Sequence, residues 1–141
     1  MKIKQQGFSL IEIMVVLVII GLLATMVGPR VFGVLSKGYE ARVVSDFATI
    51  KTALTTYKVE NYTFPTTEQG LEALVTEPQI DPKPRNWSGY LDKLPLDPWK
   101  NPYQYVSPAD GRPFDVYTLG ADGVRGGEAE NADVSIWDEA P

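Results

Sequence analysis

The chain begins with a short basic segment followed by an apolar run that is long enough to cross a membrane. Residues 8–28 read FSLIEIMVVLVIIGLLATMVG and contain one charged side chain, Glu12. A helix needs about 20 predominantly apolar residues to span the hydrocarbon core of a bilayer. Lys2 and Lys4 precede the run, and basic residues favour the cytoplasmic side of a membrane. The sequence therefore predicts one membrane-spanning helix with its N-terminus in the cytoplasm.

The composition excludes several kinds of active site. The 141 residues contain neither Cys nor His, which removes Cys and His nucleophiles, His bases, zinc sites and iron–sulfur clusters. The net charge of −5 argues against broad nucleic-acid binding, because phosphate contacts need a basic surface. No spacing of acidic, Ser or Lys residues singles out a catalytic pair. We therefore do not expect an enzyme, although a pocket holding two close carboxylates would favour one.

Glu12 lies within the apolar run and needs an explanation. An ionisable side chain inside a membrane helix costs about 2.5–3.5 kcal/mol on insertion scales and usually has a partner. Cleavage between Gly7 and Phe8 would create an α-amino group four residues before Glu12, in the same chain or in a neighbouring one. Two alternatives stay open at this point: Glu12 lies near the lipid headgroups, or the segment is a generic signal anchor.

The string GFSLIE at residues 7–12, followed by the long apolar run, resembles the class III signal of type IV pilins and type II secretion pseudopilins. The resemblance implies that a membrane-embedded prepilin peptidase cuts after Gly7 and methylates the new N-terminal Phe8. It also implies that Glu12 acts in filament assembly by pairing with the N-terminus of a neighbouring subunit.

Beyond Pro29 the pattern changes from uniformly apolar to amphipathic. Apolar residues advance by four, three, four and three positions, which draws one stripe along a helix: Val43, Phe47, Ile50, Leu54 and Tyr57. We predict one long helix from about Ser9 to Glu60, with a kink or unwound stretch at Pro29. Two helices joined at Gly28–Pro29 are the alternative.

The other faces of this helix carry charges. In a helical filament the same surface of each subunit meets a different surface of the next. We therefore expect some of the following residues to form salt bridges between subunits: Glu40, Arg42, Asp46, Lys51 and Arg85.

The second half of the chain predicts a small α+β head. Thr66 and Gln69 have capping-box spacing and predict a short second helix ending before Glu77–Pro78. A Pro-rich irregular segment follows, and we expect its large aromatic residues to be packing anchors rather than a ligand cage: Trp87, Tyr90 and Trp99. Alternation and turn residues predict strands at residues 103–106 and 114–119. We expect a last short strand at residues 134–137, after a Gly-rich loop.

Three stretches, residues 66–74, 96–105 and 119–123, narrow the resemblance to the major pseudopilin family of the type II secretion system. The resemblance implies a structural subunit that polymerises into a periplasmic pseudopilus and drives export of folded proteins across the outer membrane. A type IV pilin for adhesion or motility is the alternative. The implied segments are a leader (1–7), a transmembrane and filament-core helix (8–34) and a periplasmic head (35–141). The implied partners are copies of itself, prepilin peptidase, minor pseudopilins, an inner-membrane assembly platform and, through it, a cytoplasmic ATPase.

Residues 119–135, LGADGVRGGEAENADVS, form a Gly-rich acidic loop. Calcium takes six to eight oxygen ligands in flexible geometry, which suits such a loop, although the spacing is not that of an EF-hand. Taken alone, an acidic loop of this kind is more often simply solvated.

The resemblance implies a calcium ion in this loop. Asp122 and Asp133 would provide carboxylates and Leu119 and Val124 backbone carbonyls, with Ser135 as a further ligand. Glu128 and Glu130 are expected to be bystanders. A membrane-anchored calcium-binding receptor domain is the remaining rival, and it predicts an uncut N-terminus and no polymer.

Overall fold

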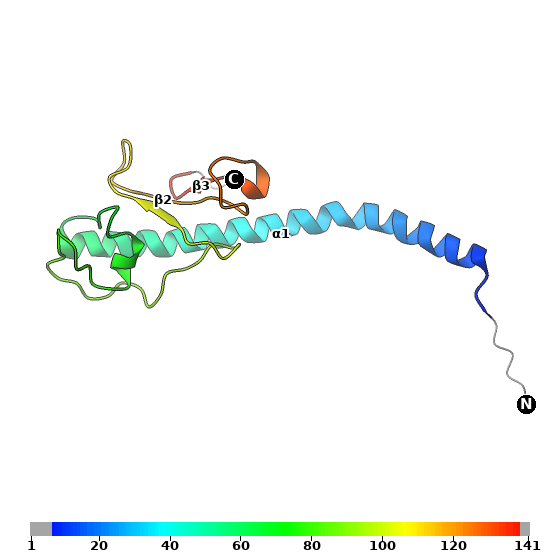
Figure 1. The fold of residues 1–141 in the computed structure, drawn as a ribbon, viewed down its shortest axis with the longest axis horizontal. Coiled ribbons are helices and arrows are strands. Elements are labelled where there is room, and N and C mark those ends of the chain that lie inside the picture. Colours follow the sequence, from blue (N-terminus) through cyan, green and yellow to red (C-terminus); the bar gives the residue numbers. More distant parts are fainter. Residues whose placement is uncertain (1–6, 139–141) are drawn as a thin grey trace, which may run out of the picture. The chain divides into compact units, whose positions relative to one another are not determined.

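The computed structural model of the chain describes residues 7–138, and for residues 28–32 it describes the backbone alone. Residues 1–6, most of the predicted leader, lie outside the described residues. Helix α1 runs without interruption over Leu10–Asn61 (Figure 1). The single long helix is therefore confirmed. The backbone is helical through Pro29, so the unwound stretch is not found in this structure, and a kink there stays a prediction. The chain divides into two compact units, Met1–Gly38 and Tyr39–Pro141.

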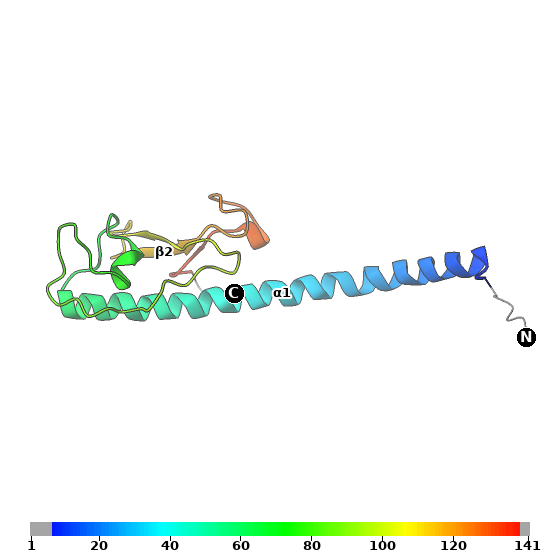
Figure 2. The ribbon, with the colours of Figure 1, turned by 60° about the horizontal axis from the view of Figure 1, so that its bottom comes forward.

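The core of the second unit is built on the amphipathic half of α1. All five residues of the predicted apolar stripe are buried, and Ile50 and Leu54 are fully so. They meet the sheet and the segments around it on one side of the helix (Figure 2). Phe47 packs against Tyr103 with ring centroids 5.3 Å apart. Because each fully buried large apolar side chain contributes about 1.5–3 kcal/mol, this stripe attaches the head to the helix.

The second helix is shorter and begins later than the capping-box spacing predicts. The capping box itself is present: the Thr66 N–H donates to Gln69 Oε1 (3.0 Å) and the Gln69 N–H to Thr66 Oγ1 (3.2 Å). It closes a turn, after which Gly70 adopts a left-handed φ of 62°. This conformation interrupts the helix, so a single 3₁₀ turn, η1, follows over Leu71–Leu74.

Three short strands form an antiparallel sheet, as predicted, and the structure gives their order as β1–β2–β3. They are β1 (Gln104–Val106), β2 (Asp115–Thr118) and β3 (Val134–Ser135). β3 ends two residues earlier than expected, because the Asp138 N–H donates to the Ser135 carbonyl and closes a turn. Trp137 leaves the strand, donates its indole N–H to the Phe114 carbonyl at 2.8 Å, and packs against the Phe114 ring.

The aromatic residues of the Pro-rich segment are packing anchors, as expected. The Trp87 indole N–H donates to the Ala73 carbonyl at 2.8 Å. Tyr90 packs on Tyr57 of α1, with ring centroids 5.2 Å apart. The Tyr90 hydroxyl donates to Glu60 Oε2 at 2.8 Å. These contacts fasten the irregular segment to η1 and to the end of α1.

Candidate functional site

The start of α1 is held by a capping box that the sequence reasoning missed. The Ser9 N–H donates to Glu12 Oε2 (2.9 Å) and the Glu12 N–H donates to Ser9 Oγ (3.2 Å). The signal was readable, because Ser-x-x-Glu before an apolar run is a known helix start. Glu12 therefore satisfies a backbone donor within its own chain and lies beside exposed Phe8. A Cβ added at Gly7 would meet nothing within 4 Å.

The first turns of α1 present an apolar surface whose one charged side chain is Glu12. Over Leu10–Val27 the mean hydropathy is 2.8 and none of the segment is buried within the chain. This is the stretch of the described residues that is long and apolar enough to cross a membrane. A helix that is apolar on every side is stable only inside a bilayer or among other apolar surfaces. The predicted membrane helix therefore has the required length and surface.

The acidic loop has a defined backbone built on glycines. The Ala121 N–H donates to the Glu130 carbonyl at 2.8 Å and ties one side of the loop to the other. Gly120 adopts a φ of 68°, and a Cβ there would lie 2.6 Å from the Asn131 carbonyl carbon. Only glycine allows this close approach. Glu128 and Glu130 add backbone carbonyls to the closure.

The structure turns the two predicted metal carboxylates toward one short stretch of the loop. Asp122 Oδ1 accepts a hydrogen bond from the Val124 N–H (3.0 Å), and Asp133 Oδ2 accepts one from the Gly126 N–H (3.1 Å). These donors are two residues apart, although the two aspartates come from opposite ends of the loop. Both side chains are exposed. Carboxylates held in this way keep further oxygen lone pairs for a cation.

The donor chemistry of this loop fits calcium. Four acidic side chains and one basic side chain give residues 119–135 a charge of 1 − 4 = −3, which favours a cation. The described residues contain no cluster of three or more acidic side chains suited to a metal. A two-carboxylate site would therefore need backbone carbonyls and water to reach six or more oxygens. The predicted carbonyls of Leu119 and Val124 belong to the same loop.

Ser135 lies less favourably than the two aspartates. Its hydroxyl donates to Asp115 Oδ1 at 2.6 Å and accepts the Trp137 N–H at 3.2 Å. Sequence reasoning missed Asp115, because its link to Ser135 depends on strand pairing across 20 residues. The hydroxyl of Ser135 therefore serves the sheet in this structure.

Two of the charged residues expected at subunit contacts pair within the chain. Arg42 Nε lies 3.7 Å from Asp46 Oδ2, and the Arg42 guanidinium also donates to the Leu96 carbonyl at 3.4 Å. Arg42 remains more than half exposed, so these contacts leave it accessible. Salt bridges between subunits stay a prediction.

Three surface grooves among the described residues have volumes near 550–580 Å³. Each is lined by at most one carboxylate: Asp92 in one, Glu12 in another and none in the third. The close carboxylate pair that would favour an enzyme is not found in these grooves.

Comparison with known proteins points to one family over nearly the whole chain. Residues 30–137 match the model described as type II secretion system, protein G, and residues 2–28 match the prokaryotic N-terminal methylation motif. The type II secretion system core protein G of Pseudomonas aeruginosa is 51% identical over 140 residues, covering 96% of each chain. That of Vibrio cholerae is also 51% identical, covering 95% of this chain and 92% of its own.

A solved structure agrees with these sequence matches. The major pseudopilin from the type 2 secretion system of enterohaemorrhagic Escherichia coli superimposes with a TM-score of 0.67 at 38% sequence identity. The match covers 75% of this chain and 92% of that one.

Proposed function

The chain belongs to the type II secretion system protein G family, and from this we propose that it is the structural subunit of that system's periplasmic pseudopilus. Polymerised subunits would drive export of folded proteins across the outer membrane. The observation that carries the proposal is the full-length similarity to core protein G, combined with the wholly exposed apolar helix. Those relatives are named for secretion rather than for adhesion or motility, which favours the pseudopilus over the alternative.

The membrane stage of the proposal rests on the apolar helix. The precursor inserts with Lys2 and Lys4 in the cytoplasm and its head in the periplasm. Prepilin peptidase then cuts between Gly7 and Phe8 and methylates Phe8, as the match to the methylation motif supports. Residues 8–34 form the filament core and residues 35–141 the periplasmic head. On leaving the bilayer, the apolar helices exchange lipid contacts for contacts with one another.

Glu12 would act at the assembly step. Cleavage leaves Ser9 in place, so the hydrogen bond between the Ser9 N–H and Glu12 Oε2 can persist in the mature chain. The amino group that cleavage creates at Phe8 of an adjacent subunit would then pair with the oxygen lone pairs of Glu12 that the Ser9 N–H leaves free. Because an unpaired charge in an apolar surrounding is unfavourable, such pairing favours the assembled state and sets the position of one helix against the next.

Calcium would fasten the acidic loop. Asp122 and Asp133 would hold the ion, together with the carbonyls of Leu119 and Val124, and the ion would supply charge neutralisation and a rigid crosslink. The convergence of both aspartates on one turn supports this set, whereas the hydrogen bonds of Ser135 make it a weaker member. The chain has no Cys, so no disulfide can crosslink this loop.

The remaining partners follow from the family. Assembly would require an inner-membrane platform, a cytoplasmic ATPase acting through it, and minor pseudopilins. No residue of the described chain is assigned to any of these contacts. The role is structural, so the chain itself would carry no catalytic step.

A complementation experiment tests the function. The chain would be expressed in a bacterium lacking its own major pseudopilin, and secretion of a folded exoprotein would be measured with pelletable filaments. Gly7→Leu should block cleavage, filaments and secretion, because the peptidase must fit this position, while the fold is unaffected since Gly7 faces open space. Gly38→Ala, at another glycine whose Cβ meets nothing within 4 Å, is the matched control. Failure of the unmutated chain to restore secretion or form filaments would overturn the proposal.

A further inference from the structure

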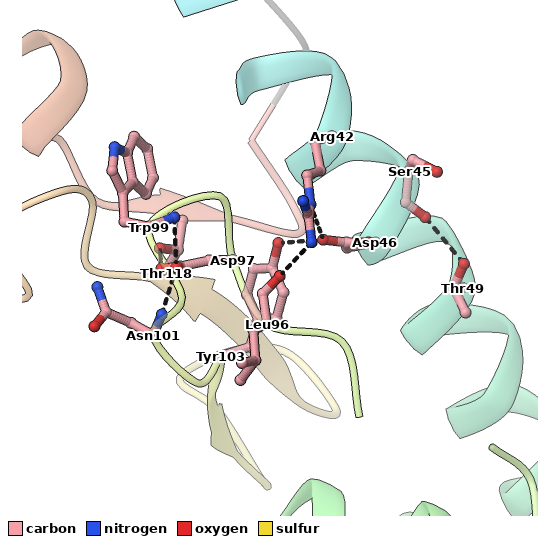
Figure 3. Close-up of polar contacts among 10 residues, drawn as sticks. All are labelled: Arg42, Ser45, Asp46, Thr49, Leu96, Asp97, Trp99, Asn101, Tyr103 and Thr118. Carbon is pink, nitrogen blue, oxygen red and sulfur yellow. Dashed lines mark hydrogen bonds and ion pairs between the residues drawn. The ribbon is translucent and has the colours of Figure 1, made fainter. Parts of the chain in front are cut away.

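Asp97 is a buried carboxylate that none of the steps above employs. It is 1% exposed and lies in the irregular segment before β1. Its Oδ1 accepts the N–H groups of Trp99 (3.0 Å) and Asn101 (2.7 Å), and its Oδ2 accepts the Thr118 hydroxyl at 2.7 Å (Figure 3). These donors are two backbone amides and one hydroxyl, with no cation among them. Burying a carboxylate is costly unless hydrogen bonds satisfy it. The three donors offset this cost, so the position is built to hold a carboxylate.

Thr118 connects Asp97 to the acidic loop through hydrogen bonds. It is the last residue of β2 and is fully buried. Its single hydroxyl hydrogen is donated to Asp97 Oδ2. Its Oγ1 lone pair accepts the Gly120 N–H at 3.2 Å. Asp97 therefore orients the Thr118 hydroxyl, so that its oxygen lone pair is free to accept the Gly120 N–H.

The Gly120 N–H belongs to the same peptide unit as the Leu119 carbonyl. That bond is not among the cis peptides of the described chain, and in a planar trans peptide the N–H and C=O point in opposite directions. Because the Gly120 N–H points to buried Thr118, the Leu119 carbonyl is directed away from that buried hydroxyl. This is the carbonyl assigned above to calcium.

We propose that Asp97 and Thr118 are positioning residues for the calcium site, acting by fixing the peptide plane that carries the Leu119 carbonyl. The proposal rests on the calcium site proposed above. Partners that orient a metal ligand typically contribute about 10–100-fold to metal affinity. Asp97 would do so from outside the acidic loop, from a segment that Arg42 of α1 also contacts through the Leu96 carbonyl.

A purely structural role for the same contacts is the competing explanation. It predicts loss of stability without a change in calcium affinity, because the dissociation constant of a fully folded chain does not depend on its margin of stability. The two roles are therefore separated by measuring both quantities on the same variants.

The test uses the full chain in detergent, with calcium binding measured by titration calorimetry and folding by circular dichroism in chelator. Thr118→Val keeps the shape of the side chain but removes the hydroxyl, and it should raise the dissociation constant for calcium about tenfold or more. Thr118→Ser restores the hydroxyl and should return the affinity close to that of the unmutated chain.

Asp97→Asn tests the same hydrogen bond from the side of its acceptor. The amide oxygen can still accept the two backbone N–H groups, but the amide nitrogen would face Thr118 Oγ1 and leave the hydroxyl hydrogen without its acceptor. This variant should also weaken calcium binding. Should Thr118→Val fail to fold in chelator, Asp97→Asn decides the question.

Tyr105→Phe is the matched control. It removes a buried hydrogen bond from a hydroxyl, that of Tyr105 to the Pro65 carbonyl (2.8 Å). This bond shares no residue with the hydrogen bonds that lead from Asp97 to Gly120. It should lower the melting temperature in chelator and leave the dissociation constant unchanged.

Each outcome decides the question. Weaker binding by Thr118→Val and Asp97→Asn, with recovery in Thr118→Ser and none of the effect in Tyr105→Phe, supports the inference. Unchanged affinity in folded Thr118→Val and Asp97→Asn overturns it while leaving the calcium site intact. Equal weakening by Tyr105→Phe, or failure of both test variants to fold, also overturns it. Absence of calcium binding by the unmutated chain overturns the calcium site and the inference together.

Discussion

The hydroxyl of Tyr103 donates a hydrogen bond to Asp46 Oδ2 at 2.9 Å, joining the start of the sheet region to the amphipathic half of α1 (Figure 3). Burial raises the pKa of Tyr103 far above its usual value, and the hydrogen bond to Asp46 raises it further. Asp46 also pairs with Arg42. Asp46, which we expected at contacts between subunits, thus also holds the head on helix α1.

Removing this hydroxyl should destabilise the head. Tyr103→Phe is predicted to lower the free energy of unfolding by about 1.5–3 kcal/mol, the range for hydrogen bonds to charged groups. Chemical denaturation of the full chain in detergent, followed by aromatic circular dichroism, measures the change. Tyr62→Phe is the control, since Tyr62 is 74% exposed and surface changes are usually within about 0.5 kcal/mol. Equal effects of the two variants would contradict the role of the Asp46 contact.

Buried phenols should make the head sensitive to alkali. Burial raises the pKa of Tyr105 from 10.0 to about 12. Below pH 10 the phenol is protonated in both the folded and the unfolded chain, so its contribution to stability is fully present. Between pH 10 and about 12 only the unfolded chain loses the proton, so stability falls as pH rises.

Melting temperatures measured across this pH range check the prediction. Tyr105→Phe should start from a lower stability at neutral pH and lose less of it on the way to pH 12. Parallel pH profiles for the variant and the unmutated chain would mean that Tyr105 does not titrate in the expected way.

Calcium should raise the melting temperature of the full chain, and the two aspartates should be required. Binding to the folded state alone stabilises it by about 2.7 kcal/mol when the free ion is at 100 times its dissociation constant. The double variant Asp122→Ala/Asp133→Ala should lose the difference between calcium and chelator. Glu128→Ala, a change of the same type within the loop, should keep it. Identical melting temperatures of the unmutated chain with calcium and with chelator would refute the calcium site.

Glu12 combines two roles that one pair of substitutions separates. Glu12→Gln keeps a capping-box acceptor for the Ser9 N–H but removes the charge, whereas Ser9→Ala removes the other half of the box and keeps the charge. If charge pairing drives assembly, Glu12→Gln should be cleaved normally yet form no pelletable filaments, and Ser9→Ala should assemble. Normal assembly of Glu12→Gln would show that the helix cap is the function of this carboxylate.

Most of the fold could be predicted from periodic patterns in the sequence. The spacing of Val43, Phe47 and Ile50 predicted the buried face of α1, because a helix of 3.6 residues per turn brings such positions onto one side. Alternation predicted β1 and β2, whereas β3 was expected as a short strand after the Gly-rich loop. The start of η1 was misplaced, because the capping-box spacing does not encode the positive φ of Gly70. That residue lies directly before η1 and separates it from the capping box.

The sites were less predictable, because they depend on contacts between distant segments. Asp97 reads as one more acidic residue in a Pro-rich stretch, and only its meeting with Thr118, 21 residues away, reveals a buried carboxylate. Likewise, no local rule brings Asp122 and Asp133 to one turn. The Ser9–Glu12 capping box is the exception, since its spacing was legible in the sequence.

The most direct test of the central claim is mass spectrometry of the N-terminus of the chain recovered from a bacterium that carries the secretion system. We predict a mature chain that begins at Phe8, carries one methyl group on its α-amino nitrogen and is found in pelletable filaments. An intact Met1, in a chain that stays monomeric in the membrane, would contradict the filament-subunit function.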